Sequence, residues 1–201
     1  MSGLAPYLTL VGTLTLAILS PGPAIVSAIQ TAMSRGRDQA MPYSLGLAFG
    51  ASLWCLCALL GLAALLRVYP GLYAGLTLLG GAYLVWIGWQ MWRAAPEPLP
   101  DAATGARKTF AGGVLLNLAN PKPALFYAAL ILSVFPEPLG ALRQASIYAA
   151  ALTTELFWYI AVTLAMSTNA MRARYRRAKI WIDRAAGLAI IVLGVLLILD
   201  R

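Results

Sequence analysis

Two short stretches, Leu19-Ser-Pro-Gly-Pro-Ala-Ile25 and Ala119-Asn-Pro-Lys-Pro-Ala-Leu125, decide the fold of this chain. They lie 100 residues apart and share the pattern Pro-x-Pro-Ala, and each is preceded by a glycine, Gly12 or Gly112. A proline inside a helix removes a backbone hydrogen bond and clashes with the preceding turn, so each stretch predicts a helix break.

The sequence around these stretches is too apolar for a water-soluble protein. Hydrophobic residues make up 61% of the 201 residues and charged residues 11%, against about 45–50% and 25% in soluble domains. Fifteen basic and seven acidic side chains cannot supply a polar surface for a chain of this length. The composition predicts an all-α integral membrane protein.

Charged residues divide the chain into apolar runs, each long enough to cross a bilayer of about 30 Å as a helix of about 20 residues. We therefore expect six transmembrane helices, near residues 4–33, 41–66, 71–92, 109–135, 144–169 and 180–200. Both Pro-x-Pro stretches then fall well inside a span, in the first and the fourth helix. These two helices are expected to be broken.

The chain is expected to form one membrane domain, residues 1–201, built as a 3+3 inverted repeat. The first repeat covers about 1–92 and the second about 109–201, and the polar, proline-rich segment 93–108 links them. In the third helix of each half, Gly81 matches Gly187 and Gly88 matches Gly194 at an offset of 106. Because each half has three spans, the second half enters from the opposite side, as in inverted-repeat transporters.

Each break predicts two half-helices that meet inside the membrane. The prolines leave four backbone carbonyls without helical partners, those of Ala17, Leu19, Asn117 and Ala119. Ser20 before Pro21 and Asn120 before Pro121 match a helix N-cap followed by a proline, so both helices should restart there.

Unpaired backbone groups are costly in lipid, so the breaks must face protein or a watery cavity. A restarting helix N-terminus suits a carboxylate, and free carbonyls suit an ammonium group or a cation. The breaks therefore predict a binding site for a zwitterionic amino acid, formed by Ser20, Pro21, Gly22, Pro23, Asn117, Asn120, Pro121 and Lys122. The alternative is that the paired prolines only kink two helices for packing.

Two charged residues lie within predicted spans and call for a partner or a function. Lys122 lies in the second break and Glu155 lies halfway along the fifth helix. A charge at the centre of a span costs at least about 2.5–3.5 kcal/mol on insertion scales. Glu155 is expected either to pair with Lys122 or to carry a proton, and a fixed ion pair that locks the helices together is the structural alternative.

Lys and Arg are distributed unevenly between the two sides of the predicted membrane. The connections after the first, third and fifth helices hold ten of them: Arg35, Arg37, Arg93, Arg107, Lys108, Arg172, Arg174, Arg176, Arg177 and Lys179. The other side holds Arg67, Arg143 and Arg201. The odd-numbered connections are therefore predicted to be cytoplasmic and both termini to face outward.

Composition also excludes several functions. The chain has no histidine, which rules out Ser-His-Asp catalysis and His-ligated metal sites. No pair of nucleophile and base stands out, so we expect neither an enzyme, a bound metal nor a cofactor. The dense basic cluster 172–179 lies between apolar runs, where topology and anionic lipid explain it without nucleic acid.

Smaller features have ordinary explanations. Cys55 and Cys57 are two residues apart on a helix, so they point in different directions and should not form a disulfide.

Gly46 and Gly50 form Gly-x-x-x-Gly, which predicts close helix packing inside one subunit, with a dimer face as the alternative. The six tryptophans are assigned to helix ends and the lipid interface, without a role in substrate binding.

With Ser20-Pro-Gly-Pro23 and Asn120-Pro-Lys-Pro123, the chain resembles the LysE/RhtB family of bacterial amino-acid exporters. The helix 2 glycines and the run Gly-Ala-Tyr-Leu-Val-Trp-Ile-Gly at 81–88 extend the resemblance over nearly the whole chain. The resemblance implies a multi-pass protein of the inner (cytoplasmic) membrane that exports amino acids or their derivatives by proton antiport. It also implies a homo-oligomer, namely a dimer.

The sequence departs from the family pattern at one position. Many relatives have a polar residue after Pro-Gly-Pro, whereas this chain has Ala24, which points to a smaller or more apolar amino acid. Two other functions remain as alternatives. One is export of a metal cation, for which hard oxygen ligands are few, and the other is a membrane scaffold subunit that transports nothing.

Overall fold

The computed structural model describes residues 3–19, 22–68, 72–97, 109–135 and 139–199. Within these ranges the chain forms seven α-helices: α1 (Leu4–Leu19), α2 (Pro23–Val68), α3 (Leu72–Ala94), α4 (Phe110–Leu118), α5 (Pro121–Val134), α6 (Ala141–Met166) and α7 (Asn169–Leu199). No strand occurs in the described ranges, which agrees with the predicted all-helical class.

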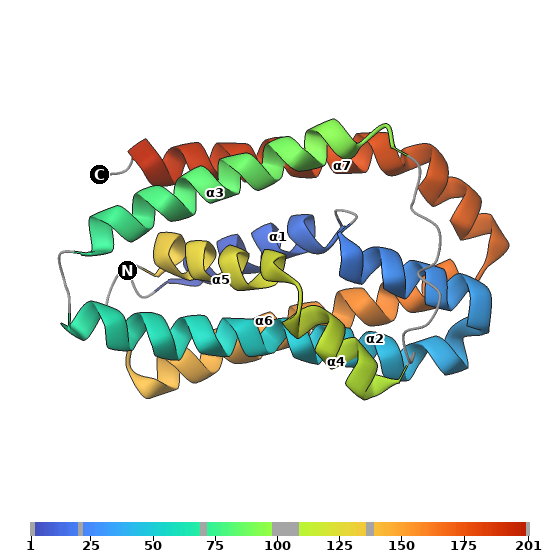
Figure 1. Ribbon diagram of the computed structural model, residues 1–201, viewed down its shortest axis with the longest axis horizontal. Coiled ribbons are helices and arrows are strands. Elements are labelled where there is room, and N and C mark those ends of the chain that lie inside the picture. The colour runs from blue at the N-terminus through green and yellow to red at the C-terminus, as the bar shows by residue number, and fades with distance from the viewer. Residues whose placement is uncertain (1–2, 20–21, 69–71, 98–108, 136–138, 200–201) are drawn as a thin grey trace.

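The long helix α2 contains a sharp turn at Gly36. This glycine has φ 75° and ψ 172°, a left-handed conformation that a residue without a β-carbon adopts at little cost. Before Gly36 the chain continues the region expected as the first span, and after it the chain runs back as the second. Figure 1 shows this reversal near the right-hand end of the molecule.

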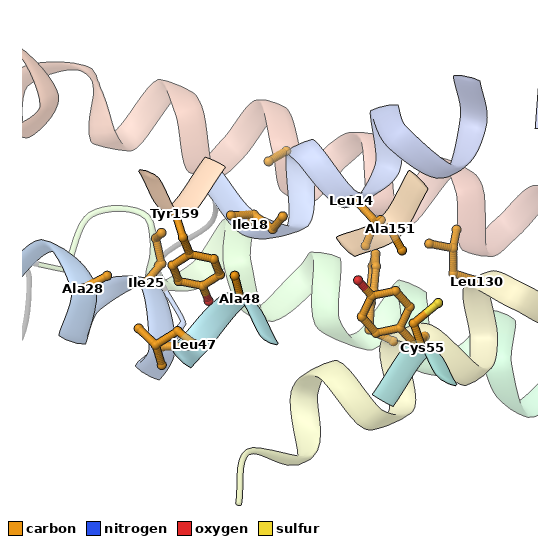
Figure 2. Close-up of a cluster of buried hydrophobic side chains, with 14 of the residues drawn as sticks. Leu14, Ile18, Ile25, Ala28, Leu47, Ala48, Cys55, Leu130, Ala151 and Tyr159 are labelled. Carbon is orange, nitrogen blue, oxygen red and sulfur yellow. The ribbon is translucent and has the colours of Figure 1, made fainter. Parts of the chain in front are cut away.

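The helices lie in three approximate layers (Figure 1). One layer is the long pair α3 and α7, and the opposite layer holds α6 with the second part of α2 and, beside it, α4. Between them lie α1 and α5. Buried apolar side chains from α1, α2, α5 and α6 fill the centre, and Figure 2 shows part of this core, including Ile18, Ile25, Leu130 and Tyr159.

Length and apolarity identify which described helices can cross a membrane. Two qualify directly, within Pro23–Gly61 and Ala141–Met166. The helices Phe110–Leu118 and Lys122–Val134 meet at a short break with a bend of 65°. If the two are counted as one, they form a third span. The helix Leu4–Ile18 is apolar but shorter than a span. The broad membrane class is therefore supported, whereas the count of six spans stays a prediction.

One expected boundary was wrong. The basic cluster 172–179 was predicted to lie in a connection, but α7 already begins at Asn169 and runs through it. The reason is intrinsic propensity, because this segment consists mostly of Arg, Lys and Ala and has neither glycine nor proline to stop a helix.

Glycines allow two pairs of helices to approach closely. A β-carbon added at Gly50 would lie 2.8 Å from the carbonyl oxygen of Val114, and one at Gly46 would collide with the carbonyl of Phe110. The Gly-x-x-x-Gly motif of α2 is therefore used to pack α4 within one chain, as predicted. Cys55, on the same helix, is buried while Cys57 is exposed, and both are free thiols, in agreement with their spacing.

Candidate functional site

The second helix break is built around Asn120. Helix α4 ends at Leu118, and α5 begins at Pro121 with Asn120 as its N-cap. The side-chain oxygen of Asn120 accepts a hydrogen bond of 3.1 Å from the backbone N–H of Lys122. The cap satisfies one N–H of the new helix, and Pro121 has no N–H to satisfy, so the chain can restart a helix here.

The first break lies between α1 and α2. Helix α1 ends at Leu19 and α2 begins at Pro23, and the carbonyl of Gly22 accepts a 3.0 Å bond from the N–H of Val26. Within the described residues α2 starts at Pro23. A proline fits the first helical position because its N–H is not needed there. Ser20 and Pro21 themselves lie outside the described residues, and their roles stay predictions.

The two breaks meet through Lys122. A β-carbon placed on Gly22 would lie 3.2 Å from Nζ of Lys122 and 3.4 Å from its Cδ. The lysine side chain thus extends from the start of α5 to the start of α2. Gly22 leaves room for it, since a β-carbon at this position would force the end of the lysine side chain to shift by a few tenths of an ångström.

A cavity lies where the breaks meet, and the space of about 460 Å³ that no atom fills there includes open solvent. Among the predicted site residues, Gly22, Asn117, Asn120, Lys122 and Glu155 line it. Pro23 is exposed and is not among the lining residues. The remaining wall is mostly apolar and comes from Leu14, Ala17, Ile18, Ala24, Ile25, Ala51, Pro123, Phe126, Tyr127 and Tyr159.

Glu155 is the carboxylate of this cavity wall, and it is 3% exposed. The Tyr127 hydroxyl donates a 2.8 Å hydrogen bond to its Oε1 atom. Its second oxygen, Oε2, has no hydrogen-bond partner among the described residues. Lys122 lines the same cavity, but the described side chains include no direct ion pair between the two. The predicted Lys122–Glu155 pairing therefore stays open.

Asn117 holds the end of α4 in place and leaves one oxygen unused. Its Nδ2 donates to the carbonyl of Leu47 at 2.6 Å, while its buried Oδ1 has no partner among the described atoms. Its backbone carbonyl accepts from the Trp54 indole N–H at 3.2 Å and from the Asn120 N–H at 3.3 Å. The carbonyl of Asn117 is thus occupied, in contrast to the prediction that it is free for a ligand, because Trp54 packs across the break.

Sequence analysis missed three aromatic contributors to the site. Trp54, which was assigned to the lipid interface, bonds the backbone at the second break. Tyr127 holds Glu155, and Tyr159 lines the cavity one helical turn after Glu155. The spacing of four residues between Glu155 and Tyr159 was the available signal, because it places both on one helix face. The contact of Trp54 had no such signal.

The polar groups of the cavity have complementary charges. An ammonium group, that of Lys122, lies beside the N-terminus of α5, which carries partial positive charge. Two buried acceptors without partners, Glu155 Oε2 and Asn117 Oδ1, belong to residues that line the same cavity. A small molecule with one anionic and one cationic end fits this distribution. No group of three or more potential metal ligands from His, Cys, Asp and Glu occurs in the described part of the chain.

The described part of the chain combines apolar helices of membrane-spanning length with a cavity lined by a few buried polar groups, as expected of a membrane protein that binds a small solute. Comparison with known sequences identifies the family. The description LysE type translocator matches residues 15–201, and the chain belongs to this family. The LysE/RhtB resemblance of the two proline motifs is thereby confirmed.

Several curated relatives are similar over nearly the whole chain. The "Threonine efflux protein" of Escherichia coli (strain K12) is 33% identical over 203 residues, covering 97% of this chain and 98% of the relative. The protein of the same name from Salmonella typhi is 33% identical over 192 residues, covering 92% and 93%. The "Chemotactic transduction protein ChpE" of Pseudomonas aeruginosa is 35% identical over 115 residues, 56% of each chain. No solved structure matches this chain.

Proposed function

We propose that this protein is a secondary active exporter of amino acids across the bacterial cytoplasmic membrane, coupled to inward movement of protons. The observation that carries the proposal is the cavity between the two helix breaks, which joins Lys122 and Gly22 to the buried acceptors Glu155 and Asn117.

The substrate is placed by charge. Its carboxylate meets the Lys122 ammonium and the N-terminus of α5, because both carry positive charge. Its ammonium meets Glu155 Oε2, the unpartnered oxygen of the buried carboxylate. Asn117 Oδ1 is left as an acceptor for a hydroxyl, and Ala17, Ala24 and Ala51 keep the apolar wall small. Threonine has all of these groups, and two relatives are named for its efflux.

Glu155 is proposed as the proton carrier. It is buried, it lines the cavity and its Oε2 has no partner among the described residues, so a proton and the substrate ammonium compete for the same oxygen. Because Glu155 must release the proton before it binds the substrate ammonium, and the reverse, this competition couples inward movement of protons to outward movement of the amino acid. The missing ion pair with Lys122 supports this role over a fixed structural pair.

We further propose six spans in an inverted 3+3 repeat, with the odd-numbered connections in the cytoplasm and both termini outside. The packing of α3 on α7 supports the repeat. A β-carbon at Gly81 would lie 2.9 Å from the Gly194 carbonyl oxygen, and one at Gly187 would lie 2.7 Å from that of Gly88. The offset of 106 relates Gly81 to Gly187 and Gly88 to Gly194. The contact of Gly81 with Gly194 therefore has its counterpart in the contact of Gly187 with Gly88, as expected for two halves related by a two-fold axis.

The alternatives have less support. A scaffold subunit needs no cavity with unpaired polar atoms, and the family match favours translocation. A metal cation prefers several oxygen ligands, whereas Glu155 is the one carboxylate among the lining residues that the structure describes. The homo-oligomeric state implied by the family resemblance stays a prediction.

Transport by the purified protein in liposomes tests the proposal. The vesicle lumen is made more acidic than the outside, and uptake of radiolabelled amino acids is screened. We expect threonine or a similar small amino acid to accumulate above its outside concentration, and a proton ionophore to abolish the accumulation. If none of the twenty amino acids accumulates under the gradient, the exporter proposal is contradicted.

A further inference from the structure

The face of α6 that carries Glu155 changes its chemistry at this residue. One and two helical turns before it, the same face carries Ala151 and Ile147, and both are fully buried apolar residues. One, two and three turns after it, the face carries hydroxyl groups, those of Tyr159, Thr163 and Ser167. A spacing of four residues places all of these side chains along one face of the helix. We call the last three the hydroxyl row of α6.

The hydroxyl row leads from the cavity to the end of the helix. Tyr159 is 4% exposed and lines the cavity together with Glu155. Thr163 is fully buried, and Ser167, which is half-buried, caps the end of α6. At a rise of about 1.5 Å per residue, the row covers about 18 Å from Glu155 to Ser167. The proposed topology places this end of α6 in the cytoplasm.

The middle of the row is hydrogen-bonded to a second helix. The Thr163 Oγ1 atom lies 2.7 Å from Ser44 Oγ on α2 and 2.8 Å from the Tyr159 carbonyl oxygen. Bonds from Thr or Ser to a carbonyl four residues earlier are common in helices, and Ser167 makes one to Thr163 at 2.7 Å. The bond to Ser44 is not of this kind, because it joins two fully buried side chains of different helices. Since a hydroxyl has one hydrogen, Thr163 bonds either Ser44 or its own helix at a given moment.

The first member of the row is directed toward the same helix. In Figure 2 the side chain of Tyr159 points toward Leu47 and Ala48 of α2. Ser44 lies one helical turn from Ala48, in the direction of the Gly36 turn. The Tyr159 ring and the bonded pair of Thr163 and Ser44 therefore follow one another along the interface of α2 and α6.

This arrangement suits a proton and not an amino acid. Among the described residues, the lining of the cavity includes Tyr159 but neither Thr163 nor Ser167. A fully buried, hydrogen-bonded side chain leaves no passage for a solute. A hydroxyl passes a proton without moving, because its oxygen accepts one proton and releases its own.

The charges near Glu155 are consistent with a neutral route beyond the cavity. Four ionisable side chains lie near it: Lys122 and Tyr127 on α5, Tyr159 on α6 and Cys55 on α2. Past Tyr159 the row continues with Thr163 and Ser167, whose hydroxyls stay neutral as a proton passes. A carboxyl with an unpartnered oxygen in the cavity, Glu155, thus lies where the apolar half of the helix face meets the hydroxyl half.

We propose that the hydroxyl row of α6, together with Ser44, is the route by which Glu155 releases its proton to the cytoplasm. The O–H bond of the Glu155 carboxyl breaks as a new O–H bond forms on water in the cavity, and this water protonates the Tyr159 oxygen. Each hydroxyl in turn gives up its own proton as it takes one, and water at the end of α6 accepts the last. The inference rests on the proposed function and topology, since Glu155 is taken there as the proton carrier.

Thr163→Val tests the route, because it replaces the central hydroxyl with a methyl group of similar size. In liposomes with an acidic lumen, we expect threonine accumulation to slow at least several-fold, while exchange of labelled for unlabelled threonine continues at the wild-type rate. Thr163→Ser keeps the hydroxyl and should accumulate threonine as the wild type does. Equal accumulation by Thr163→Val and the wild type would overturn the route. An equal fall in exchange and accumulation would also overturn it, since that is the result of a merely structural role.

Thr154→Val is the matched control on the same helix. Thr154 is buried, and its hydroxyl also bonds the carbonyl four residues earlier, that of Ala150, at 2.8 Å. It directly precedes Glu155 and so lies outside the row. Accumulation and exchange should both stay at the wild-type rate, and slowing of accumulation equal to that of Thr163→Val would contradict the role of the row.

A second measurement does not depend on transport. After a jump from acidic to alkaline pH in detergent, the loss of the Glu155 carboxyl band is followed by time-resolved infrared spectroscopy, and Glu155→Gln identifies the band. We expect Thr163→Val to slow this proton release several-fold and Thr154→Val to leave it unchanged. Equal rates in all three proteins would overturn the route. If Thr163→Val slows the release but the wild type moves no amino acid, the proposed function fails while the proton route stands.

Discussion

The Nζ atom of Lys122 lies 3.2 Å from the position that a β-carbon on Gly22 would occupy. This contact joins the start of α2 to the start of α5, which are the two places where the chain interrupts a helix and begins another. It also explains the difference between the motifs, Pro-Gly-Pro in one half and Pro-Lys-Pro in the other. The missing side chain of one motif makes room for the long side chain of its counterpart.

Replacing Gly22 by alanine should therefore impair transport more than folding. The added methyl group would lie 3.2 Å from Lys122 Nζ, so the end of the lysine side chain must shift by a few tenths of an ångström, and small misplacements of a binding group lower transport rates. We expect a several-fold loss of threonine transport in liposomes, with normal membrane insertion. Gly12→Ala is the matched control on α1, because nothing lies within 4 Å of its added β-carbon. Equal losses in both variants would contradict the contact.

Replacing Gly88 by alanine should impair stability. The new β-carbon would lie 2.5 Å from the carbonyl oxygen of Gly187, so α3 and α7 must separate. Overpacking of this kind costs about 1–3 kcal/mol, and the apparent melting temperature in detergent should fall. Gly75→Ala on the same helix meets nothing within 4 Å and should leave the melting temperature nearly unchanged. An unchanged Gly88→Ala protein would argue against the close packing of these helices.

Glu155→Gln should separate substrate movement from proton movement. Glutamine keeps an oxygen that accepts from Tyr127, so the local structure is retained, but it cannot carry a proton. We expect exchange of labelled for unlabelled threonine to continue, whereas a pH gradient no longer drives accumulation. Tyr127→Phe is the control, since it removes the 2.8 Å hydrogen bond and leaves the carboxyl group in place. Full gradient-driven accumulation by Glu155→Gln would exclude Glu155 as the carrier.

Trp54→Phe tests the support of the second break. The substitution removes the indole donor from the Asn117 carbonyl but leaves the Asn120 N–H bonded there. Loss of one such bond costs about 0.5–1.5 kcal/mol, so we expect a small drop in melting temperature and a raised KM for threonine. Trp181→Phe is the control at an exposed position. A KM unchanged by Trp54→Phe would mean that the indole does not position the site.

Much of this organisation was predictable because it depends on local chemistry. The cap formed by Asn120, the interruption near Pro121 and the buried position of Glu155 each follow from a few neighbouring residues. Family membership was predictable from the two proline motifs. The close packing of Gly46 and Gly50 also follows from spacing on one helix, although only the fold shows that α4 is the partner.

Other features depend on how distant helices meet. The bond from Trp54 to the Asn117 carbonyl joins residues 63 positions apart, and the bond from Tyr127 to Glu155 joins residues 28 positions apart. The hydrogen bonds from Lys179 to the carbonyls of Ala94 and Ala95 likewise depend on how α7 meets the end of α3.

The central claim is that the cavity between the two helix breaks binds the amino acid that the protein exports, with Lys122 as the group that binds its carboxylate. Threonine accumulation in liposomes with an acidic lumen, compared for the wild type, Lys122→Met and Lys122→Arg, tests it most directly. We predict accumulation by the wild type, partial accumulation by Lys122→Arg and none by Lys122→Met at equal amounts of inserted protein. Accumulation by Lys122→Met at the wild-type rate and affinity would contradict the account.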